Sequence, residues 1–198
     1  MAASVVLTAL RHVWLTLDRL RCPRALMGGL ALSVWKRVRA TRDVDLLVAT
    51  AHVDLDGLLV ELERAGIRPK HRPPILDLQS VRIVQLLYEP PDSFTDLQID
   101  LLLAESDYHK QAMKRCVDAQ LPDLELTIQV LACEDLILHK LMAGRIIDRA
   151  DGAALLRANH GSLDYRYLEN WVNHLRLGSE WAEIWKDAFP GVENPLPN

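Results

Sequence analysis

The chain has 198 residues, of which 49% are hydrophobic and 25% charged, a composition typical of a soluble globular protein rather than a disordered chain. Its formal net charge of −4 argues against nucleic-acid binding through overall charge, although a local basic patch would still permit it. Because the cysteines are isolated, we expect neither a disulfide framework nor a zinc site, and a cytoplasmic protein. Charges interrupt the N-terminal segment and no long apolar run is present, so we expect neither a signal peptide nor a membrane span.

Helices and strands are mixed in the first two thirds of the chain. Apolar residues at helical spacing predict a helix over residues 4–20, and Pro23 ends it. The elements expected next are a strand over Arg24–Met27, a helix over Leu30–Val38, a strand over Asp43–Val48 and a helix over Asp54–Ala65 capped by Gly66. Beyond a proline-containing irregular stretch we expect antiparallel strands over Val81–Tyr88 and Leu97–Leu103, a helix over Asp107–Ala119 and a strand over Leu124–Leu131.

From Cys133 onward the pattern is helical until a short tail. The sequence therefore predicts an α+β protein, with a mixed sheet flanked by helices in residues 1–132 and a C-terminal helical region in residues 133–198.

Two acids begin the strand Asp43–Val48. Alternate residues of a strand share a face, so Asp43 and Asp45 are expected to point the same way at the edge of an apolar strand. Such a repelling pair is explained if a divalent cation binds there. Thr41 and Arg39 lie just before the acids and would supply a hydroxyl and a cation to an anionic ligand.

A third acid, Asp100, interrupts the apolar strand Leu97–Leu103. Burial of an unpaired charge is costly, so Asp100 is expected either to pair with an arginine such as Arg82 or to face a metal. Together with Asp43 and Asp45, the metal is the better interpretation, because carboxylates around one or two magnesium ions are the arrangement of nucleotidyl transfer.

Two further features fit a phosphate ligand. Gly28 and Gly29 precede a predicted helix, where backbone can approach a phosphate closely, although a plain tight turn is the commoner role of such a pair. In one continuous helix, Lys140, Gly144, Asp148 and Asp151 would share a stripe, and the alternative is a solvated helix face with ion pairs.

Taken together, these motifs resemble the DNA polymerase β-like nucleotidyltransferase superfamily. The segments GGLAL, RATRDVDL, IDLL and KLMAGRIIDRAD resemble more particularly the AbiEii/MenT type of nucleotidyltransferase toxin, over most of residues 20–157. The resemblance implies a polymerase β-like core and an enzyme that transfers a nucleotide from an NTP, such as ATP, to an acceptor. Its implied partners are NTP, RNA (with the tRNA 3′ end expected) and a cognate antitoxin protein, and no membrane is involved.

The resemblance also implies a role for each matching residue. Gly28 and Gly29 would cradle the triphosphate, while Asp43, Asp45 and Asp100 would bind Mg²⁺, with Asp100 also acting as base. Lys140 would neutralise triphosphate charge, and Asp148 or Asp151 would be the downstream acid. Thr41 stands where an antitoxin could modify a hydroxyl.

The chain departs from the pattern at two places. Leu30 replaces a Ser or Thr after the glycines, which Ser33 could compensate, and Ile146 and Ile147 stand where a basic residue is usual. The basic residues of the first 42 positions are expected to form an RNA-facing patch. Two rival functions remain open: transfer to a small molecule or a protein hydroxyl, and a non-catalytic module that binds a nucleotide or a partner.

Overall fold

The computed structural model describes residues 2–50, 53–78, 81–91, 93–121 and 126–196. Contacts along the chain gather in two compact units: Met1–Leu30 with Ala40–Leu131, and Ala31–Arg39 with Ala132–Asn198. A short piece of the N-terminal half therefore packs in the same unit as the C-terminal helices. The predicted domain boundary after residue 132 stays a prediction.

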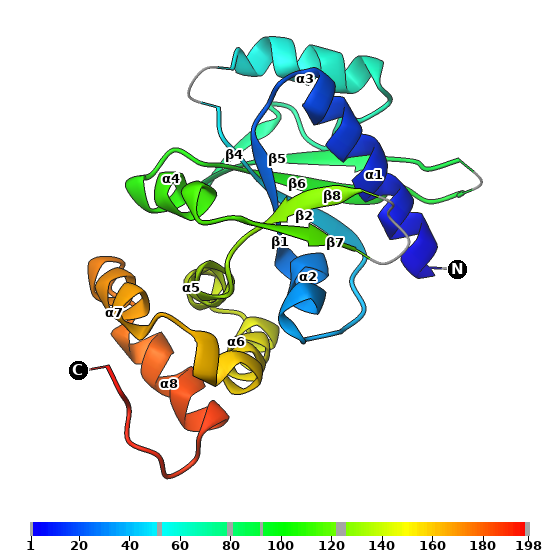
Figure 1. Ribbon diagram of the computed structural model, residues 1–198. Helices are drawn as coiled ribbons and strands as arrows, with labels where there is room; N and C mark the ends of the chain where they lie inside the picture. The colour runs from blue at the N-terminus through cyan, green and yellow to red at the C-terminus, as the bar shows by residue number, and fades with distance from the viewer. Residues whose placement is uncertain (1, 51–52, 79–80, 92, 122–125, 197–198) are drawn as a thin grey trace. The chain divides into compact units, whose positions relative to one another are not determined.

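The first unit is built on a mixed sheet of eight strands (Figure 1). The strand order is β3-β5-β6-β2-β1-β8-β7, and β4 pairs with β5 off this path. The strands are β1 Arg24–Met27, β2 Asp43–Val48, β3 Arg68–Pro69, β4 Ile75–Leu78, β5 Val81–Tyr88, β6 Leu97–Leu103, β7 Val117–Gln120 and β8 Thr127–Val130. Because β2 runs parallel to β6 and antiparallel to β1, the strands that carry the predicted acids are direct neighbours.

The two faces of this sheet differ in chemistry, because successive residues of a strand point to opposite sides. Val44 and Leu46 of β2 point to one side and are fully buried. Helix α1 (Ala2–Arg19) covers that side: Arg24, which faces the same way as Leu46, stacks on Trp14 of α1 at 4.4 Å from the ring centre. We call the opposite side, which carries the acids, the acid face.

Helices α3 (Leu55–Arg64) and α4 (Asp107–Lys114) complete the regular structure of the first unit (Figure 1). The imidazole of His12 on α1 lies 2.8 Å from the carbonyl oxygen of Ala65, so it ties α1 to the end of α3. His12 also stacks on Tyr88 of β5, with ring centres 4.4 Å apart. These contacts hold α1 on the side of the sheet away from the acids.

The second unit is helical. Its elements are η1 Leu32–Trp35, α5 Cys133–Ala143, α6 Ile146–Asn159, η2 His160–Ser162, α7 Tyr165–His174 and α8 Gly178–Ala188, with α2 Gly28–Ala31 leading into η1. Helix α6 is central, since α5, α8 and η1 all contact it. The Asn159 amide donates to the carbonyl oxygen of Trp35 at 3.0 Å and fixes η1 to the end of α6.

Most predicted elements are confirmed. The strands β1, β2, β5 and β6 have the bounds that the alternating patterns predict, and β5 and β6 are antiparallel. Helices α1 and α3 are also present, and Gly66 follows α3 with a left-handed φ of 81°, as expected at a helix C-terminus. The predicted strand over Leu124–Leu131 is shorter, at Thr127–Val130, and its residues 124 and 125 lie outside the described residues.

Two predicted helices are wrong in extent. The helix over Leu30–Val38 is only the short α2 followed by a 3₁₀ turn, because Lys36 adopts a φ of 64° and its N–H bonds back to the carbonyls of Leu32 and Ser33. The helix over Asp107–Ala119 stops at Lys114, because the next residues form β7 and satisfy their backbone groups against β8.

The condition of one continuous helix through Lys140 and Asp151 is not met. Gly144 takes a left-handed φ of 64° and ends α5, and α6 begins at Ile146. No helix among the described residues is both long enough and apolar enough to cross a membrane.

Candidate active site

Three predicted acids share the acid face of the first unit. Asp45 of β2 and Asp100 of β6 are directly paired in the parallel ladder, so their side chains leave the sheet on the same side. Asp43 precedes Asp45 by two residues and points the same way. The alternation of two neighbouring strands therefore brings Asp43, Asp45 and Asp100 to one side of the sheet, as the sequence predicts.

The backbone of Gly28 lies directly against Asp45. Met27 pairs with Asp45 across β1 and β2, so the chain leaves β1 beside this acid. A Cβ atom on Gly28 would overlap the carboxylate group of Asp45, at 2.5 Å from its carboxyl carbon, and the φ of Gly28 is +64°. Only glycine satisfies both conditions without strain. The glycine pair is thus placed next to an acid rather than in an unrelated turn.

Neutral amides hold the carboxylate of Asp100. The amide nitrogen of Gln98 donates to both carboxylate oxygens at 3.0 Å, and that of Gln85 donates to one of them at 3.3 Å. The alternative partner, Arg82, instead binds Glu105 at 2.7 Å. Gln85 is the partner because it, and not Arg82, stands opposite Asp100 in the antiparallel ladder of β5 and β6.

The pKa of Asp100 lies above its usual value. Burial is the main cause, and the charge of Asp43 adds to it, while hydrogen bonds from Gln98 and Gln85 and the charge of Lys70 act in the opposite direction. A carboxyl group whose charged form is disfavoured in this way suits a group that accepts a proton, and it also gains from a nearby cation.

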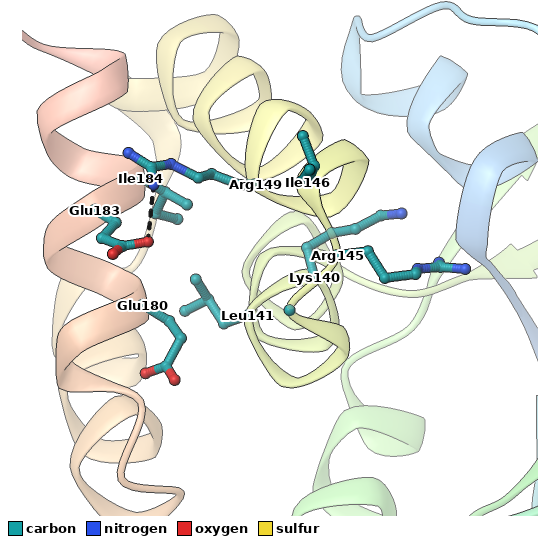
Figure 2. Close-up of a pocket in the computed structure, with 9 residues that line it drawn as sticks. Lys140, Leu141, Arg145, Ile146, Arg149, Glu180, Glu183 and Ile184 are labelled. Atoms are coloured by element: carbon teal, nitrogen blue, oxygen red, sulfur yellow. Dashed lines mark hydrogen bonds and ion pairs between the residues drawn. The ribbon is translucent and has the colours of Figure 1, made fainter.

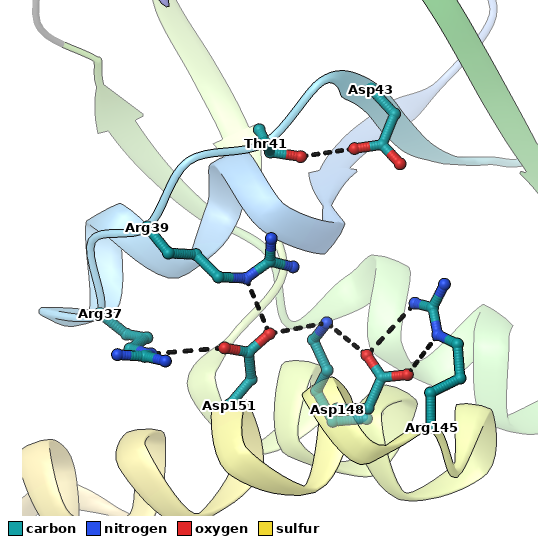
Figure 3. Close-up of polar contacts among 8 residues, drawn as sticks. Arg37, Arg39, Thr41, Asp43, Arg145, Asp148 and Asp151 are labelled. Atoms are coloured by element: carbon teal, nitrogen blue, oxygen red, sulfur yellow. Dashed lines mark hydrogen bonds and ion pairs between the residues drawn. The ribbon is translucent and has the colours of Figure 1, made fainter.

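Thr41 and Asp43 are joined by a hydrogen bond, in which the hydroxyl of Thr41 donates to the Asp43 carboxylate (Figure 3). The segment before β2 therefore brings a hydroxyl to the first acid, as the sequence suggests. Modification of this hydroxyl stays a prediction.

Three carboxylates on one face have the chemistry of a site for a hard divalent cation. In the structure, Asp43 and Asp100 form hydrogen bonds with neighbouring side chains. Among the described residues, no three His, Cys, Asp or Glu side chains are already gathered closely enough to hold a metal ion. Neither Asp43 nor Asp100 forms an ion pair with a described residue; a hydroxyl and two amides hold them instead. Carboxylate oxygens gathered on one face of a sheet are the kind of donor that Mg²⁺ prefers.

The second unit holds a separate group of buried charges. Asp148 and Asp151 are both fully buried, and Lys140 is only 6% exposed. The Lys140 ammonium lies 2.7 Å from Asp148 and 3.3 Å from Asp151, so it bridges α5 and α6 (Figure 3). The break at Gly144 makes this possible, because it folds α6 back onto α5. The three residues are therefore brought together across two helices rather than along one.

Arginines complete this buried group. Arg145 binds Asp148 with N–O distances of 2.6 and 3.2 Å, and Asp151 accepts from Arg39 at 2.9 Å and from Arg37 at 3.3 Å. Asp151 thus fixes the segment that leads from η1 towards Thr41. We call Lys140, Asp148, Asp151 and these three arginines the buried ion-pair cluster after its buried acids and lysine, because the Arg145 side chain itself is 69% exposed. Ser33, the last predicted nucleotide contact, is exposed in η1.

The cluster compensates the charge of its acids. Burial would raise the pKa of Asp148, but hydrogen bonds from Arg145 and Lys140 outweigh it, so this pKa lies below its usual value. Asp148 is thus held in its charged form by partners in its own unit. Asp148 and Asp151 both bind Lys140, and they differ in their second partner, which is Arg145 for one and Arg37 with Arg39 for the other.

A pocket opens beside the cluster, between the start of α6 and helix α8 (Figure 2). Its wall is of mixed charge, since Arg149 binds Glu183 across it at 2.9 Å and Glu180 lies nearby. Lys140 and Arg145 also line it, but both are committed to Asp148. Ile146, at the start of α6, is 93% exposed, and the basic residue before it, Arg145, binds Asp148.

Sequence reasoning missed several residues of these two sites. Gln98 is predictable as a partner of Asp100, because it lies two residues earlier on the same face of the strand. Gln85 also carries a signal, because it is a lone amide in an apolar strand. The partners of Asp151 carry no local signal, since Arg39 is 112 positions away. Of the basic residues in the first 42 positions, Arg24 binds Asp18 at 2.8 Å on the side of α1, and Arg37 and Arg39 bind Asp151.

Comparisons with solved structures place the fold. The solution structure of the antibiotic-resistance factor ANT(2′′)-Ia is 17% identical with a TM-score of 0.56, and the match covers 94% of this chain and 98% of that one. A crystal structure of the same factor in complex with adenylyl-2′′-tobramycin is 16% identical with a TM-score of 0.55, over 87% of this chain and 98% of that one. JHP933 from Helicobacter pylori is 17% identical with a TM-score of 0.50, over 93% and 80%.

At these identities the similarity is one of fold, and it confirms the predicted α+β nucleotidyltransferase architecture. None of the curated proteins compared with the chain matches it. A family model described as nucleotidyl transferase AbiEii toxin, type IV toxin–antitoxin system, matches residues 8–153, which is more than half of the chain. The chain is therefore a nucleotidyltransferase and belongs to the AbiEii toxin family.

Proposed function

We propose that this nucleotidyltransferase transfers a nucleoside monophosphate from an NTP to RNA, with the 3′ end of tRNA as its acceptor, and acts as the toxin of a toxin–antitoxin pair. The observation that carries the proposal is the acid face, where Asp45 is paired with Asp100 and lies against the backbone of Gly28. Family membership supports the NTP substrate and an antitoxin partner.

Each residue of the acid face has a proposed task. Asp43, Asp45 and Asp100 would hold Mg²⁺, and Gly28 and Gly29 would let the triphosphate approach the backbone beside Asp45. When bound, the metal would offset phosphate charge and favour the departure of pyrophosphate. Asp100, with its raised pKa, accepts the proton of the acceptor hydroxyl.

The proposed transfer exchanges one phosphorus–oxygen bond for another. The acceptor hydroxyl oxygen forms a bond to the α-phosphorus of the NTP, and the bond from that phosphorus to the bridging oxygen breaks. Pyrophosphate leaves with the bonding electrons, and the hydroxyl proton passes to Asp100. Attack and departure occur on opposite sides of the phosphorus, because the displacement is in line.

Thr41 offers a place for the antitoxin to act. Its hydroxyl already donates to Asp43, so a phosphoryl group there would put negative charge beside the acids. Phosphorylated Thr41 would repel both Asp43 and the NTP, and it would silence the toxin. Mass spectrometry of the toxin co-expressed with its antitoxin tests this directly, since no added mass on the Thr41 peptide would contradict it.

The acceptor is tested by incubating the protein with Mg²⁺, each of the four α-labelled NTPs, and total tRNA. We expect label from at least one NTP on tRNA, and none when the 3′ end has been oxidised with periodate. Parallel reactions contain an aminoglycoside or a protein extract without RNA. Label in those reactions and not on tRNA would replace the RNA acceptor with a small molecule or a protein hydroxyl.

A further inference from the structure

Two exposed side chains are connected to Asp100 through its amide partners. The Lys70 ammonium donates to the side-chain oxygen of Gln98 at 2.6 Å, and the His71 ring lies 3.1 Å from that of Gln85. Gln98 and Gln85 in turn bind Asp100. Lys70 and His71 are therefore on the acid face, and one side chain separates each of them from the proposed catalytic acid.

Lys70 forms no direct contact with an acid in the described part of the chain, although its charge acts on Asp100 through space. Its hydrogen-bond partner is a neutral amide, and it forms no ion pair with any described residue. Buried and half-buried cations elsewhere in the chain differ, since Lys140, Arg39 and Arg24 each bind an aspartate. Arg72 lies close by in sequence, with its side chain 87% exposed and a long ion pair of 3.9 Å to Glu63. Lys70, His71 and Arg72 together form what we call the basic segment.

Strand order places the basic segment opposite the glycine pair. The acids stand on β2 and β6 in the middle of the sheet, and β1, which ends at Gly28, is on one side of them. Strands β5 and β3 are on the other side, and Lys70 follows β3 directly, with its N–H on the carbonyl of Gln85 at 2.9 Å. The two phosphate-compatible features of the first unit therefore flank the acids.

In-line displacement gives these two sides different tasks. If pyrophosphate leaves on the side of the glycine pair, the acceptor hydroxyl has to approach from the opposite side. That side is the one with the basic segment. An acceptor with a polyanionic backbone would find there a cation whose direct hydrogen-bond partner is a neutral amide.

We propose that the basic segment binds the sugar–phosphate backbone of the acceptor RNA just before its reactive 3′ end, and so directs that end to Asp100. This inference rests on the proposed RNA acceptor. The proposed RNA surface therefore differs from the basic patch that the sequence predicts in the first 42 residues. Helix α1, with Arg11 and Arg19, covers the side of the sheet away from the acids. Phosphate contacts of this kind position a strand without reading its sequence.

The test measures RNA affinity separately from NTP affinity. Lys70→Gln and Arg72→Gln variants of the full chain are titrated against fluorescent tRNA without NTP, over a range of salt concentrations. Each variant is expected to weaken binding about fivefold and to reduce the slope of log affinity against log salt by about one. In transfer assays the KM for tRNA should rise while the KM for the NTP stays within about twofold. Lys70→Arg keeps the charge and should restore binding.

Arg11→Gln with Arg19→Gln is the matched control, because it removes two cations from the opposite side of the sheet and should leave tRNA affinity unchanged. Equal tRNA affinity for wild type, Lys70→Gln and Arg72→Gln would overturn the inference, as would a loss confined to the control. A rise in the NTP KM instead of the tRNA KM would assign the segment to the triphosphate and overturn it too. A wild type that labels no RNA would mark failure of the proposed acceptor itself.

Discussion

The two units use the same residue type in opposite electrostatic settings. On the acid face, Asp43 and Asp100 are held by a hydroxyl and neutral amides, and the pKa of Asp100 is raised. In the buried ion-pair cluster, Asp148 and Asp151 contact four cations, and the pKa of Asp148 is lowered. Asp43 and Asp100 are thus bound by neutral groups, whereas Asp148 and Asp151 are bound by cations.

This difference separates a chemical role from a structural one. Carboxylates that repel one another weaken the fold, and they are explained where a metal and a phosphate will bind. A buried acid with its cations in place has little to offer a metal, but its removal leaves partners buried without a counter-charge. We therefore expect substitutions on the acid face to affect transfer, and substitutions in the cluster to affect stability.

The largest effect is expected on the acid face. Asp45→Asn keeps the shape of the side chain but removes its charge, so nucleotide transfer should fall about a thousandfold, equivalent to about 4 kcal/mol of transition-state stabilisation. The unfolding free energy in urea should change little. Asp77→Asn, at an exposed position of β4, is the control and should retain full transfer. Retained transfer in Asp45→Asn would contradict the role of this acid.

The next largest effect is expected in the cluster. Lys140→Met leaves Asp148 and Asp151 buried without their shared cation, so the unfolding free energy should fall by about 3 kcal/mol. Lys110→Met is the control, because Lys110 is 54% exposed and binds the exposed Asp107 at 3.4 Å, a pair worth about 0.5 kcal/mol or less. If Lys140→Met is as stable as wild type but inactive, Lys140 acts on the triphosphate, as the resemblance implies.

Gly28→Ala tests the contact between the glycine pair and Asp45. An added methyl group would displace the Asp45 carboxylate and strain a φ of +64°, so transfer should fall about a hundredfold and stability by about 1–2 kcal/mol. Gly66→Ala matches the strain but not the contact, since its φ is +81° and nothing lies within 4 Å of the added atom. That variant should lose about 1 kcal/mol of stability and keep its transfer rate, and equal rates in both variants would argue against the contact.

The smallest effect is the pH dependence of stability. The pKa of Asp148 is lower in the folded chain, so its contribution is present above its unfolded value of about 3.9 and is lost as pH falls through the folded value. The stability difference between wild type and Asp148→Asn should be constant at pH 6–8 and shrink below about pH 4.

The substitution of Asp100 should change stability in the opposite direction. Its raised pKa makes the charged form unfavourable at pH 7, so Asp100→Asn should be more stable than wild type. Denaturation in urea from pH 7 to 3 measures both, and equal signs for the two variants would refute the contrast.

The acid face could be predicted from the sequence, and the cluster could not. The period of two in β2 and β6 fixes which side Asp43, Asp45 and Asp100 leave, and burial of the alternate residues fixes the strands themselves. These are local signals. The pairing of Asp151 with Arg39 depends on tertiary packing between segments far apart in sequence, for which the chain carries no periodic pattern.

The helix break at Gly144 shows what the sequence leaves open in the second unit. Glycine in a helical pattern is tolerated at moderate cost or ends the helix, and the local sequence does not decide between the two. In the structure α5 ends at Gly144 and α6 folds back on it, which brings Lys140 to Asp148. Similarly, the local sequence predicts the end of a helix where β7 forms. The strand is stabilised by pairing with β8, which the local sequence does not show.

Metal binding by the acid face tests the central claim most directly. Mn²⁺ can replace Mg²⁺, and its binding with a non-hydrolysable NTP analogue can be followed by electron paramagnetic resonance on wild type, Asp45→Asn and Asp148→Asn. We predict that wild type and the folded fraction of Asp148→Asn bind Mn²⁺ with similar affinity, and that Asp45→Asn binds it at least about tenfold more weakly. Equal Mn²⁺ affinity in wild type and Asp45→Asn, or a loss confined to Asp148→Asn, would contradict the assignment of the two sets of acids.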